Sequence, residues 1–311
     1  MNPFFLIGAE RSGTTLLRLM LNGHPLISWL NEFEYSVDQI VNNDIWPDIE
    51  CYSDYLSTNR IFQSTGFTID KKLNYPDLIK SFLSQKQERD AKPIVGATCH
   101  RHYDRLLRIF PRARFIYLLR DPRDVARSNI GMGWAGNVWK GVDRWVEAEN
   151  LWENLKQNLR ENISYIEVRY ENLISEPEAT LSAICSFINV EYDSSMMSYP
   201  NYTTYSIPDP SLTEQWKRKM SIKEIELVES KIFDHMKKRG YAPHSTSPDA
   251  PSTVRKILLN IQDKIFRVRF KVQRFGLGLV LYDFISRKCR LKFLEKGIQI
   301  RINEKTKKFL K

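Results

Sequence analysis

A polar turn near the start of the chain holds residue types that bind phosphate groups. An apolar run at residues 4–7 leads to Gly8, and apolar residues return at helical spacing from Leu16 onward. This pattern indicates a strand, a tight loop and the first turn of a helix. Backbone N–H groups of such a loop converge on one point, where the helix dipole favours negative charge. We therefore expect phosphate contacts from one cation and four loop residues: Arg11, Ser12, Gly13, Thr14 and Thr15.

This loop differs from the phosphate loop of nucleoside triphosphatases. The spacing from Gly8 to Gly13 fits the pattern Gly-x4-Gly-Lys-Ser/Thr, but Thr14 stands where that pattern has lysine. A small-molecule kinase of the P-loop type would need the lysine, so this alternative is disfavoured. An ordinary turn between a strand and a helix, without a ligand, is the other interpretation that the loop alone leaves open.

A second strand–helix unit begins at residue 115. Residues 115–119 have the composition of a buried parallel strand, Asp121 can cap the helix that follows, and Pro122 suits its first position. Parallel sheets bind ligands at the carboxyl ends of their strands, where Arg120 lies. Ser128 follows about two helical turns later. A guanidinium and a hydroxyl placed in this way suit a second phosphate.

Both motifs resemble the phosphate sites of sulfotransferases that use 3′-phosphoadenosine-5′-phosphosulfate (PAPS). The resemblance rests on residues 11–16 with His24-Pro25 and on residues 111–128, and it covers about residues 1–240. In motif style it is closest to bacterial carbohydrate-type and tyrosylprotein sulfotransferases. It implies that the first loop holds the 5′-phosphosulfate and that Arg120 and Ser128 hold the 3′-phosphate. It also implies sulfuryl transfer to an acceptor hydroxyl without a metal ion.

The resemblance also assigns a catalytic base. Matched to tyrosylprotein sulfotransferases by spacing from His-Pro, Glu32 faces the acceptor and takes the proton of the attacking hydroxyl. Glu34 is the alternative, and both could instead be solvated loop charges. Many family members resemble Gly-Asp-Lys-Thr-Pro where this chain has Gly-Ala-Thr-Cys-His at residues 96–100, so it lacks that lysine. His100 and His102 could also face the acceptor, although a lone histidine is more often structural.

Two further segments are expected to lie near the nucleotide. Lys219, in the basic run at residues 216–219, is a candidate PAPS contact, and a solvated charge run is the alternative. Arg169 and Tyr170 belong to an Arg-Tyr-Glu-x-Leu stretch that resembles one after the fourth core strand of the family. We expect these two residues to support the nucleotide side of the fold and to take no part in catalysis.

The predicted fold is an α/β three-layer sandwich with a central, mostly parallel sheet. Expected strands lie at the start of the chain, at residues 93–97, 115–119 and about 164–168; a helix is expected at about 103–110. A later helix should bury an apolar stripe, which consists of Trp145, Ala148, Leu151, Trp152 and Leu155. Residues 1–245 form the catalytic domain and residues 246–311 a basic amphipathic extension. Within the extension, Ile298, Ile300 and Ile302 alternate as in a strand.

Charge is unevenly distributed along the chain. Residues 252–311 hold 17 basic and 4 acidic residues, a net charge of +13, whereas the remainder has a net charge of −3. With an apolar helical seam, this charge predicts contact with an anionic membrane surface or, alternatively, with an acidic glycan. Docking of the seam on the catalytic domain is the alternative, and nucleic acid is disfavoured because no binding motif accompanies the charge.

Location and acceptor are predicted only in general terms. Four scattered cysteines, and the absence of a signal or an apolar run of 18 residues, favour a cytoplasmic protein. The acceptor is then expected to be a saccharide, a glycolipid or a small hydroxyl compound. A non-catalytic nucleotide- or membrane-binding protein is the alternative from outside the enzymes.

Overall fold

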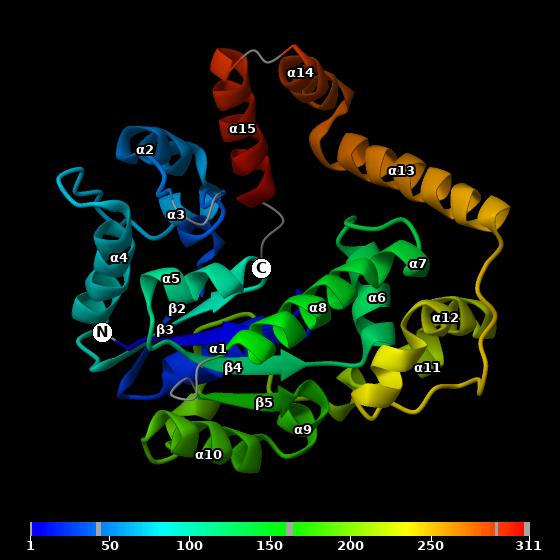
Figure 1. Cartoon of the computed structure of the whole chain (residues 1–311), viewed down its shortest axis with the longest axis horizontal. Helices are drawn as coiled ribbons and strands as arrows, with labels where there is room; N and C mark the ends of the chain where they lie inside the picture. The colour runs from blue at the N-terminus through cyan, green and yellow to red at the C-terminus, as the bar shows by residue number, and fades with distance from the viewer. Residues whose placement is uncertain (1, 42–44, 160–163, 290–291, 308–311) are drawn as a thin grey trace.

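Five parallel strands in the order β2-β3-β1-β4-β5 form the centre of the computed structural model, which describes residues 2–41, 45–159, 164–289 and 292–307 (Figure 1). The strands are β1 (Phe4–Ile7), β2 (Ile27–Glu32), β3 (Ile94–Cys99), β4 (Arg114–Leu119) and β5 (Tyr165–Arg169). Because all neighbours are parallel, the carboxyl ends of the strands meet at one edge of the sheet. The predicted parallel sheet is confirmed, with the phosphate loop after its middle strand.

Helices pack on both sides of this sheet. The first seven are α1 (Thr14–Gly23), α2 (Ile49–Thr58), α3 (Arg60–Gln63), α4 (Tyr75–Asp90), α5 (Leu106–Ile109), α6 (Pro122–Gly131) and α7 (Val138–Gly141). They are followed by α8 (Asp143–Asn158), α9 (Tyr170–Ser175), α10 (Pro177–Ile188), α11 (Trp216–Lys219) and α12 (Ile222–Lys238). The C-terminal helices are α13 (Thr253–Phe275), α14 (Leu277–Lys288) and α15 (Lys292–Lys307).

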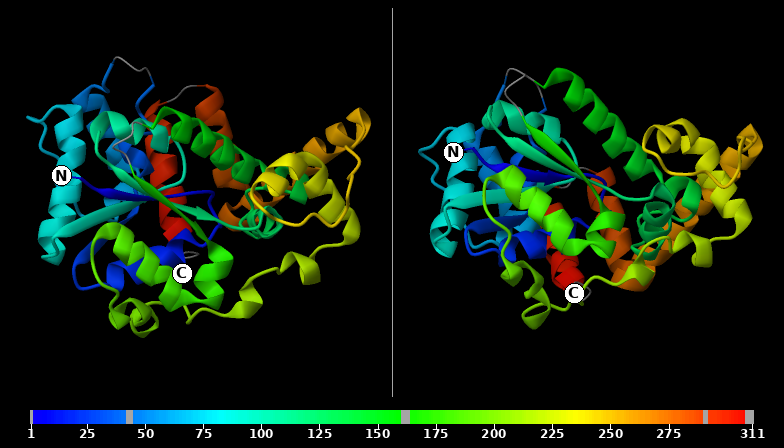
Figure 2. Two further views of the ribbon diagram at one scale, coloured as in Figure 1. Left: turned by 60° about the horizontal axis from the view of Figure 1, so that its bottom comes forward. Right: turned by 90° about the horizontal axis from the view of Figure 1, so that it is seen from below.

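Alternate side chains of β1 enter two separate hydrophobic cores. Phe5 and Ile7 pack in one core with residues of α4, α8 and α12. Phe4 and Leu6 pack in the other with residues of α1, α9 and α10. This two-sided burial is why the strand is apolar at every position. The turned views in Figure 2 show helices on both sides of the sheet, and the predicted three-layer arrangement is confirmed.

Most of the predicted elements are present, with differences in detail. Helix α6 begins at Pro122, and the Asp121 side chain accepts a hydrogen bond from the N–H of Arg123, as expected for a cap. The stripe predicted on α8 packs in the first core. The helix expected at 103–110 is a 3₁₀ turn at 103–105 followed by the short α5. Strand β2, which ends at Glu32, was not predicted.

The prediction of a strand around residue 300 is wrong, because this segment lies in helix α15. Ile298 and Ile302 are four residues apart and therefore share one face of the helix, where both are half-buried. Ile300 points away from that face and is 43% exposed. Alternating isoleucines therefore do not distinguish a strand from a helix. In a helix the first and third isoleucine share one face and can pack together while the second is exposed.

The C-terminal helices arch across the molecule from α7 to α2 (Figure 1). At one end the N–H of Gly136 donates to Asp263 Oδ1 at 2.7 Å, and at the other Lys296 Nζ lies 2.7 Å from Asp54 Oδ1. The extension therefore contacts the rest of the chain at two places, while the predicted boundary near residue 245 stays a prediction. Within the described ranges, no helix combines the length and apolar character required to cross a bilayer.

Candidate active site

The loop between β1 and α1 follows a path that its glycines permit. Gly8 and Gly13 both have a positive φ, of 139° and 97°, which disfavours other residues. A Cβ on Gly13 would also lie 2.3 Å from the ring of Tyr170. Arg11 itself adopts a φ of 71°, an uncommon conformation for a residue with a side chain. The loop is thus closely fitted against its neighbours, and α1 begins immediately after it at Thr14.

Both predicted phosphate motifs contact each other directly. Arg11 Nε donates a hydrogen bond to Ser128 Oγ at 3.0 Å, and Arg120 Nη1 donates to the carbonyl of Arg11 at 3.1 Å. The sheet brings them together because β1 and β4 are neighbours. In the described part of the chain, the buried hydroxyl of Ser12 has no hydrogen-bond partner. A buried unpaired hydroxyl in this loop is what a site built for a ligand oxygen would present.

A cavity of about 450 Å³ opens beside these contacts. It brings together four of the predicted residues, Arg11, Arg120, Ser128 and Lys219. The remaining lining residues are Asp124, Arg127, Gly131, Met132, Tyr170, Leu212 and Gln215. Four basic residues therefore surround this space with one acidic residue. Burial, and to a smaller extent the charge of Arg120, lower the pKa of Arg11, which an anion bound between the two guanidinium groups would reverse.

Arg120 is held in place by several protein groups. Its guanidinium carbon lies 4.2 Å from the centre of the Tyr170 ring, and Nη2 donates to the carbonyl of Leu212 at 2.9 Å. Nη2 also lies 3.5 Å from Asp124 Oδ2. Its Nε is buried without a partner among the described residues. The guanidinium therefore lines the cavity with its Nε–H unpaired, which a ligand oxygen could accept.

Tyr170 and Arg127 are the lining residues whose roles the sequence did not reveal. Tyr170 was expected only to support the nucleotide side, but its ring contacts Arg120 and limits the space beside Gly13. Arg127 directly precedes Ser128 on α6, so the motif implied that it lies near the cavity. The motif did not imply that its side chain lines the cavity. Lys219 lies at the exposed rim and donates to Gln215 Oε1.

A second cluster of polar residues lies at the carboxyl ends of β2 and β3. His100 Nδ1 lies 2.7 Å from Glu34 Oε1, and the N–H of His100 donates to the same oxygen at 2.9 Å. On its other side, His100 Nε2 lies 2.9 Å from Thr14 Oγ1. The cluster therefore connects a buried carboxylate to the first residue of α1 at the phosphate loop.

The pKa values of this pair shift in opposite directions. Burial alone would lower the pKa of His100, but the hydrogen bond and charge of Glu34 outweigh it and raise that pKa. Burial alone would raise the pKa of Glu34, but the hydrogen bonds and charge of His100 outweigh it and lower that pKa. Both shifts favour the ion pair. With Glu34 as acceptor, Nδ1 carries hydrogen, and Nε2 of the neutral ring accepts from Thr14.

Glu32 lies at the end of β2, next to this pair. Its side chain is open to solvent, but neighbouring residues desolvate the carboxylate and, together with the charge of Glu34, raise its pKa. Its negative charge also helps to raise the pKa of His100. The structure thus separates the two glutamates: Glu34 is buried and paired, while Glu32 is accessible. The sequence contained a signal for this cluster. His100 directly follows strand β3, which is the neighbour of β2, so the residues after these two strands meet at the same edge of the sheet.

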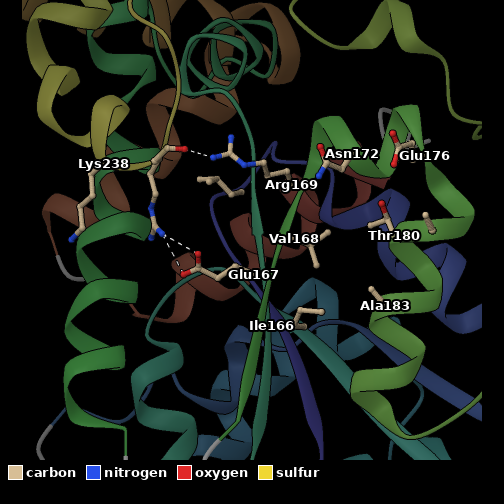
Figure 3. Close-up of a pocket in the computed structure, with 12 residues that line it drawn as sticks. Ile166, Glu167, Val168, Arg169, Asn172, Glu176, Thr180, Ala183 and Lys238 are labelled. Carbon is tan, nitrogen blue, oxygen red and sulfur yellow. Dashed lines mark hydrogen bonds and ion pairs between the residues drawn. The ribbon is translucent and has the colours of Figure 1, made fainter.

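A different cavity, of about 520 Å³, lies along β5 (Figure 3). It contains Arg169, whose guanidinium donates to the carbonyl of Arg239. Glu167 pairs with Arg239 at 3.1 Å. These polar groups bind one another and hold β5 to the end of α12. Across the described ranges, no cluster of three or more His, Cys, Asp and Glu residues suits a metal ion.

The sequence matches a known protein family. A family model described as "Sulfotransferase family" matches residues 3–194. The chain is 26% identical over 219 residues to protein-tyrosine sulfotransferase A of Caenorhabditis elegans, covering 64% of this chain and 53% of that protein. It is 22% identical over 275 residues to protein-tyrosine sulfotransferase 1 of Danio rerio, covering 79% of this chain and 74% of that protein.

A solved structure shows the same fold. The sulfotransferase domain from the curacin biosynthetic pathway superposes with a TM-score of 0.54 at 19% identity, covering 78% of this chain and 98% of that domain. The matched family segment ends before α11 and the C-terminal helices. The phosphate loop, Glu32, His100, Arg120 and Ser128 all lie within it.

Proposed function

Because this chain belongs to the sulfotransferase family, we propose that it transfers a sulfuryl group from PAPS to an acceptor hydroxyl. The observation that supports this donor is the cavity shared by Arg11, Arg120, Ser128 and Lys219. These four residues come from three separate segments of the chain, and three of the four residues are cations. A nucleotide with phosphates at both its 5′ and 3′ positions would satisfy such an arrangement, since charge-assisted bonds to phosphate are strong.

Each part of the cavity has a role in this proposal. The amides of residues 12–15 hold the 5′-phosphate at the N-terminus of α1, and Arg11 neutralises charge on the sulfuryl and leaving phosphate oxygens. Arg120 and Ser128 bind the 3′-phosphate, with Lys219 at the rim.

The acceptor oxygen forms a bond to sulfur while the bond between sulfur and the phosphate oxygen breaks. The product nucleotide is 3′,5′-adenosine bisphosphate. Positioning and electrostatics carry most of such a transfer, as in phosphoryl transfer.

The acceptor proton goes to Glu32 in this proposal. An accessible carboxylate with a raised pKa is a better base than an ordinary one at neutral pH. His100 is a second candidate, because its Nε2 lies 2.9 Å from the hydroxyl of Thr14 at the phosphate loop. Its bond to Glu34 places Nε2 toward that loop as the proton-accepting nitrogen when the ring is neutral.

The acceptor is a hydroxyl group of a saccharide, a glycolipid or a small molecule in our proposal. The names of the relatives from C. elegans and D. rerio add protein tyrosine as a further hydroxyl to test. Incubation with labelled PAPS and separate pools of glycans, glycolipids, phenols and tyrosine peptides distinguishes these classes by which pool becomes labelled. A cytoplasmic location is part of the same proposal.

Nucleotide binding tests the donor separately from the acceptor. Isothermal titration should show binding of 3′,5′-adenosine bisphosphate and much weaker binding of 5′-AMP and ATP. Arg120→Ala should remove about 1.5–3 kcal/mol from binding of the bisphosphate and have little effect on 5′-AMP. Equal losses for both ligands would mean that Arg120 supports the fold rather than the 3′-phosphate. Preference for ATP would instead favour a kinase, and binding without transfer to any pool would favour a non-catalytic protein.

A further inference from the structure

Helix α13 carries a continuous apolar face that the rest of the described chain leaves exposed. Six side chains form this face, which we call the α13 seam, and they are 48–68% exposed: Val254, Ile257, Leu258, Ile261, Ile265 and Val268. Scattered exposed apolar residues are ordinary, whereas a contiguous set marks an interaction surface. On α14 the exposed apolar residues continue with Leu277, Leu281, Tyr282, Phe284 and Ile285.

The opposite face of α13 attaches the helix to the catalytic domain. The amide of Asn137 donates to the carbonyl of Leu259 at 2.8 Å, and Asp263 accepts from the N–H of Gly136. Phe266 and Phe270 lie farther along the same face, against the glycine-rich segment at 133–136. With 100° of rotation per residue, this docked face and the α13 seam lie on opposite sides of the helix. The seam therefore does not cover the catalytic domain, which was the alternative that the sequence left open.

The charges of α13 show which partner suits the seam. The helix contains seven basic residues and one acidic residue, and the acidic one is Asp263 on the docked face. Lys264 and Lys271 lie on one side of the seam and Arg269 on the other, as the helical rotation places them. A helix with an apolar face bordered by cations binds in the interface of an anionic bilayer.

Other occupants fit this surface less well. A second copy of the chain would bring two strongly positive surfaces together, which costs free energy. A nucleic acid or acidic glycan would pair with the cations but would leave the apolar side chains in water. We propose that the α13 seam docks the protein on an anionic lipid bilayer. The docked helix then lies between the bilayer and the segment at 133–137, which follows Gly131 and Met132 of the nucleotide cavity.

Vesicle co-sedimentation of the full-length protein tests this proposal without reference to catalysis. Vesicles of phosphatidylcholine alone are compared with vesicles that also contain phosphatidylglycerol, at low and high salt. The seam variant is Ile257→Gln/Ile261→Gln/Ile265→Gln. Its matched control is Ile207→Gln/Ile222→Gln, which changes isoleucines that are 65% and 59% exposed outside the extension. A charge variant, Lys264→Gln/Arg269→Gln/Lys271→Gln, alters exposed residues only and serves as the second test.

The expected result is salt-sensitive binding to the anionic vesicles alone. The seam variant should lose this binding, the charge variant should bind on the order of 10²-fold more weakly, and the control should bind like wild type. Thermal unfolding of each variant verifies that it is folded. Wild-type affinity in both the seam and charge variants would overturn the proposal. It would also be overturned if no vesicle bound and the seam mediated a dimer, or if the only binding were to DNA, unchanged in the seam variant.

Discussion

Glu32 and His100 are the two candidate bases for the acceptor proton, and their environments differ. Glu32 is accessible with a raised pKa, whereas His100 is paired with Glu34 on one side and meets Thr14 on the other. We predict that Glu32→Gln lowers kcat by about 10²- to 10⁴-fold and leaves binding of 3′,5′-adenosine bisphosphate unchanged. Single-turnover kinetics and isothermal titration measure the two effects separately.

Replacement of His100 distinguishes two possible roles of this residue, a catalytic base and a residue that positions the phosphate loop. If Glu32 is the base, His100→Gln should change donor binding as well as rate, because it removes a contact to Thr14. Near wild-type turnover in Glu32→Gln, together with a loss confined to kcat in His100→Gln, would transfer the role to His100. The pH dependence of kcat gives a second readout, since Glu32→Gln should lose the fall in rate at acidic pH.

The pair of Glu34 and His100 should make stability depend on pH. Glu34 has a folded pKa below its usual 4.5, so its contribution is present above that value and is lost as pH falls. His100 has a folded pKa above its usual 6.5, so its contribution is complete below that value and is lost as pH rises through the folded pKa. Both contributions are present together between those two values. We predict that Glu34→Gln lowers the free energy of unfolding by about 3–5 kcal/mol near pH 5.5.

An exposed glutamate provides the control for this prediction. Glu50 pairs with Lys71 at 2.6 Å, but both side chains are more than half exposed. Glu50→Gln should therefore cost about 1 kcal/mol or less at every pH. Urea unfolding near pH 5.5 and at about pH 9 measures both variants, and the cost of Glu34→Gln should be smaller at the higher value. A cost that is equal at both values would show that the charge of His100 does not contribute.

At the scale of elements, strand–helix units were predictable where one continuous pattern specified them. Strand β1 is apolar at every position, and β4 is hydrophobic at every position after Arg114, because both faces of the sheet are covered. Asp121-Pro122 indicates where α6 begins. Strand β2 lacks such a pattern, since Ser28 and Asn31 interrupt its apolar residues. The hydroxyl of its buried Ser28 donates to Asp90 Oδ2 on α4 at 2.7 Å, which satisfies the polar group inside the protein. A local pattern contains no information about that distant partner.

The same limit separates the candidate site residues. Arg11, Arg120 and Ser128 lie in motifs whose spacing indicates phosphate, and the parallel sheet brings those motifs together. The contact of Tyr170 with Arg120 depends instead on how α9 packs beside the loop. Likewise, the choice between Glu32 and Glu34 depends on side-chain direction at the end of β2, where a 3₁₀ turn at 34–36 places Glu34 inward. Sequence spacing does not specify that turn.

The glycine at the end of the phosphate loop permits a test of the loop as an element. We predict that Gly13→Ala is more destabilising than Gly66→Ala, although both glycines have a positive φ. Gly66 has open space around it, so its substitution costs only the backbone strain, about 1–2 kcal/mol. At Gly13 the new Cβ would also overlap the ring of Tyr170. Thermal unfolding gives the two costs, and titration should show weaker nucleotide binding in Gly13→Ala alone. Equal costs would mean that the loop moves to accommodate a Cβ.

At the scale of the whole molecule, the charge separates the C-terminal extension from the catalytic domain, whereas the contacts connect the two. The sheet and its two helix layers carry the family match, whereas the strongly basic segment after residue 252 lies outside it. Nevertheless α13 contacts the segment at 133–137 and α15 contacts α2. The extension is therefore attached at both ends of an arch. The predicted boundary near residue 245 is then a question of whether the extension unfolds separately from the catalytic domain.

Two aspartates of the extension distinguish attachment from internal stability. Both pair with an arginine four residues later: Asp263 with Arg267 at 3.5 Å and Asp283 with Arg287 at 2.8 Å. Only Asp263 also accepts the N–H of Gly136 from the catalytic domain. We predict that Asp263→Ala weakens the attachment by about 1–3 kcal/mol, because the amide of Gly136 loses its acceptor. Asp283→Ala, its matched control, should leave the attachment unchanged.

Hydrogen exchange of the two full-length variants measures this attachment. In Asp263→Ala, the amides at 133–137 and along α13 should exchange on the order of 10- to 100-fold faster, while β1 and β4 keep their protection. Such a pattern means that the extension opens as a unit of its own, as the predicted division at residue 245 requires. Faster exchange throughout the sheet would instead show that the helices after residue 252 are part of one cooperative structure. Unchanged exchange in α13 would assign the attachment to other contacts of its docked face, of which Phe266 and Phe270 are the largest.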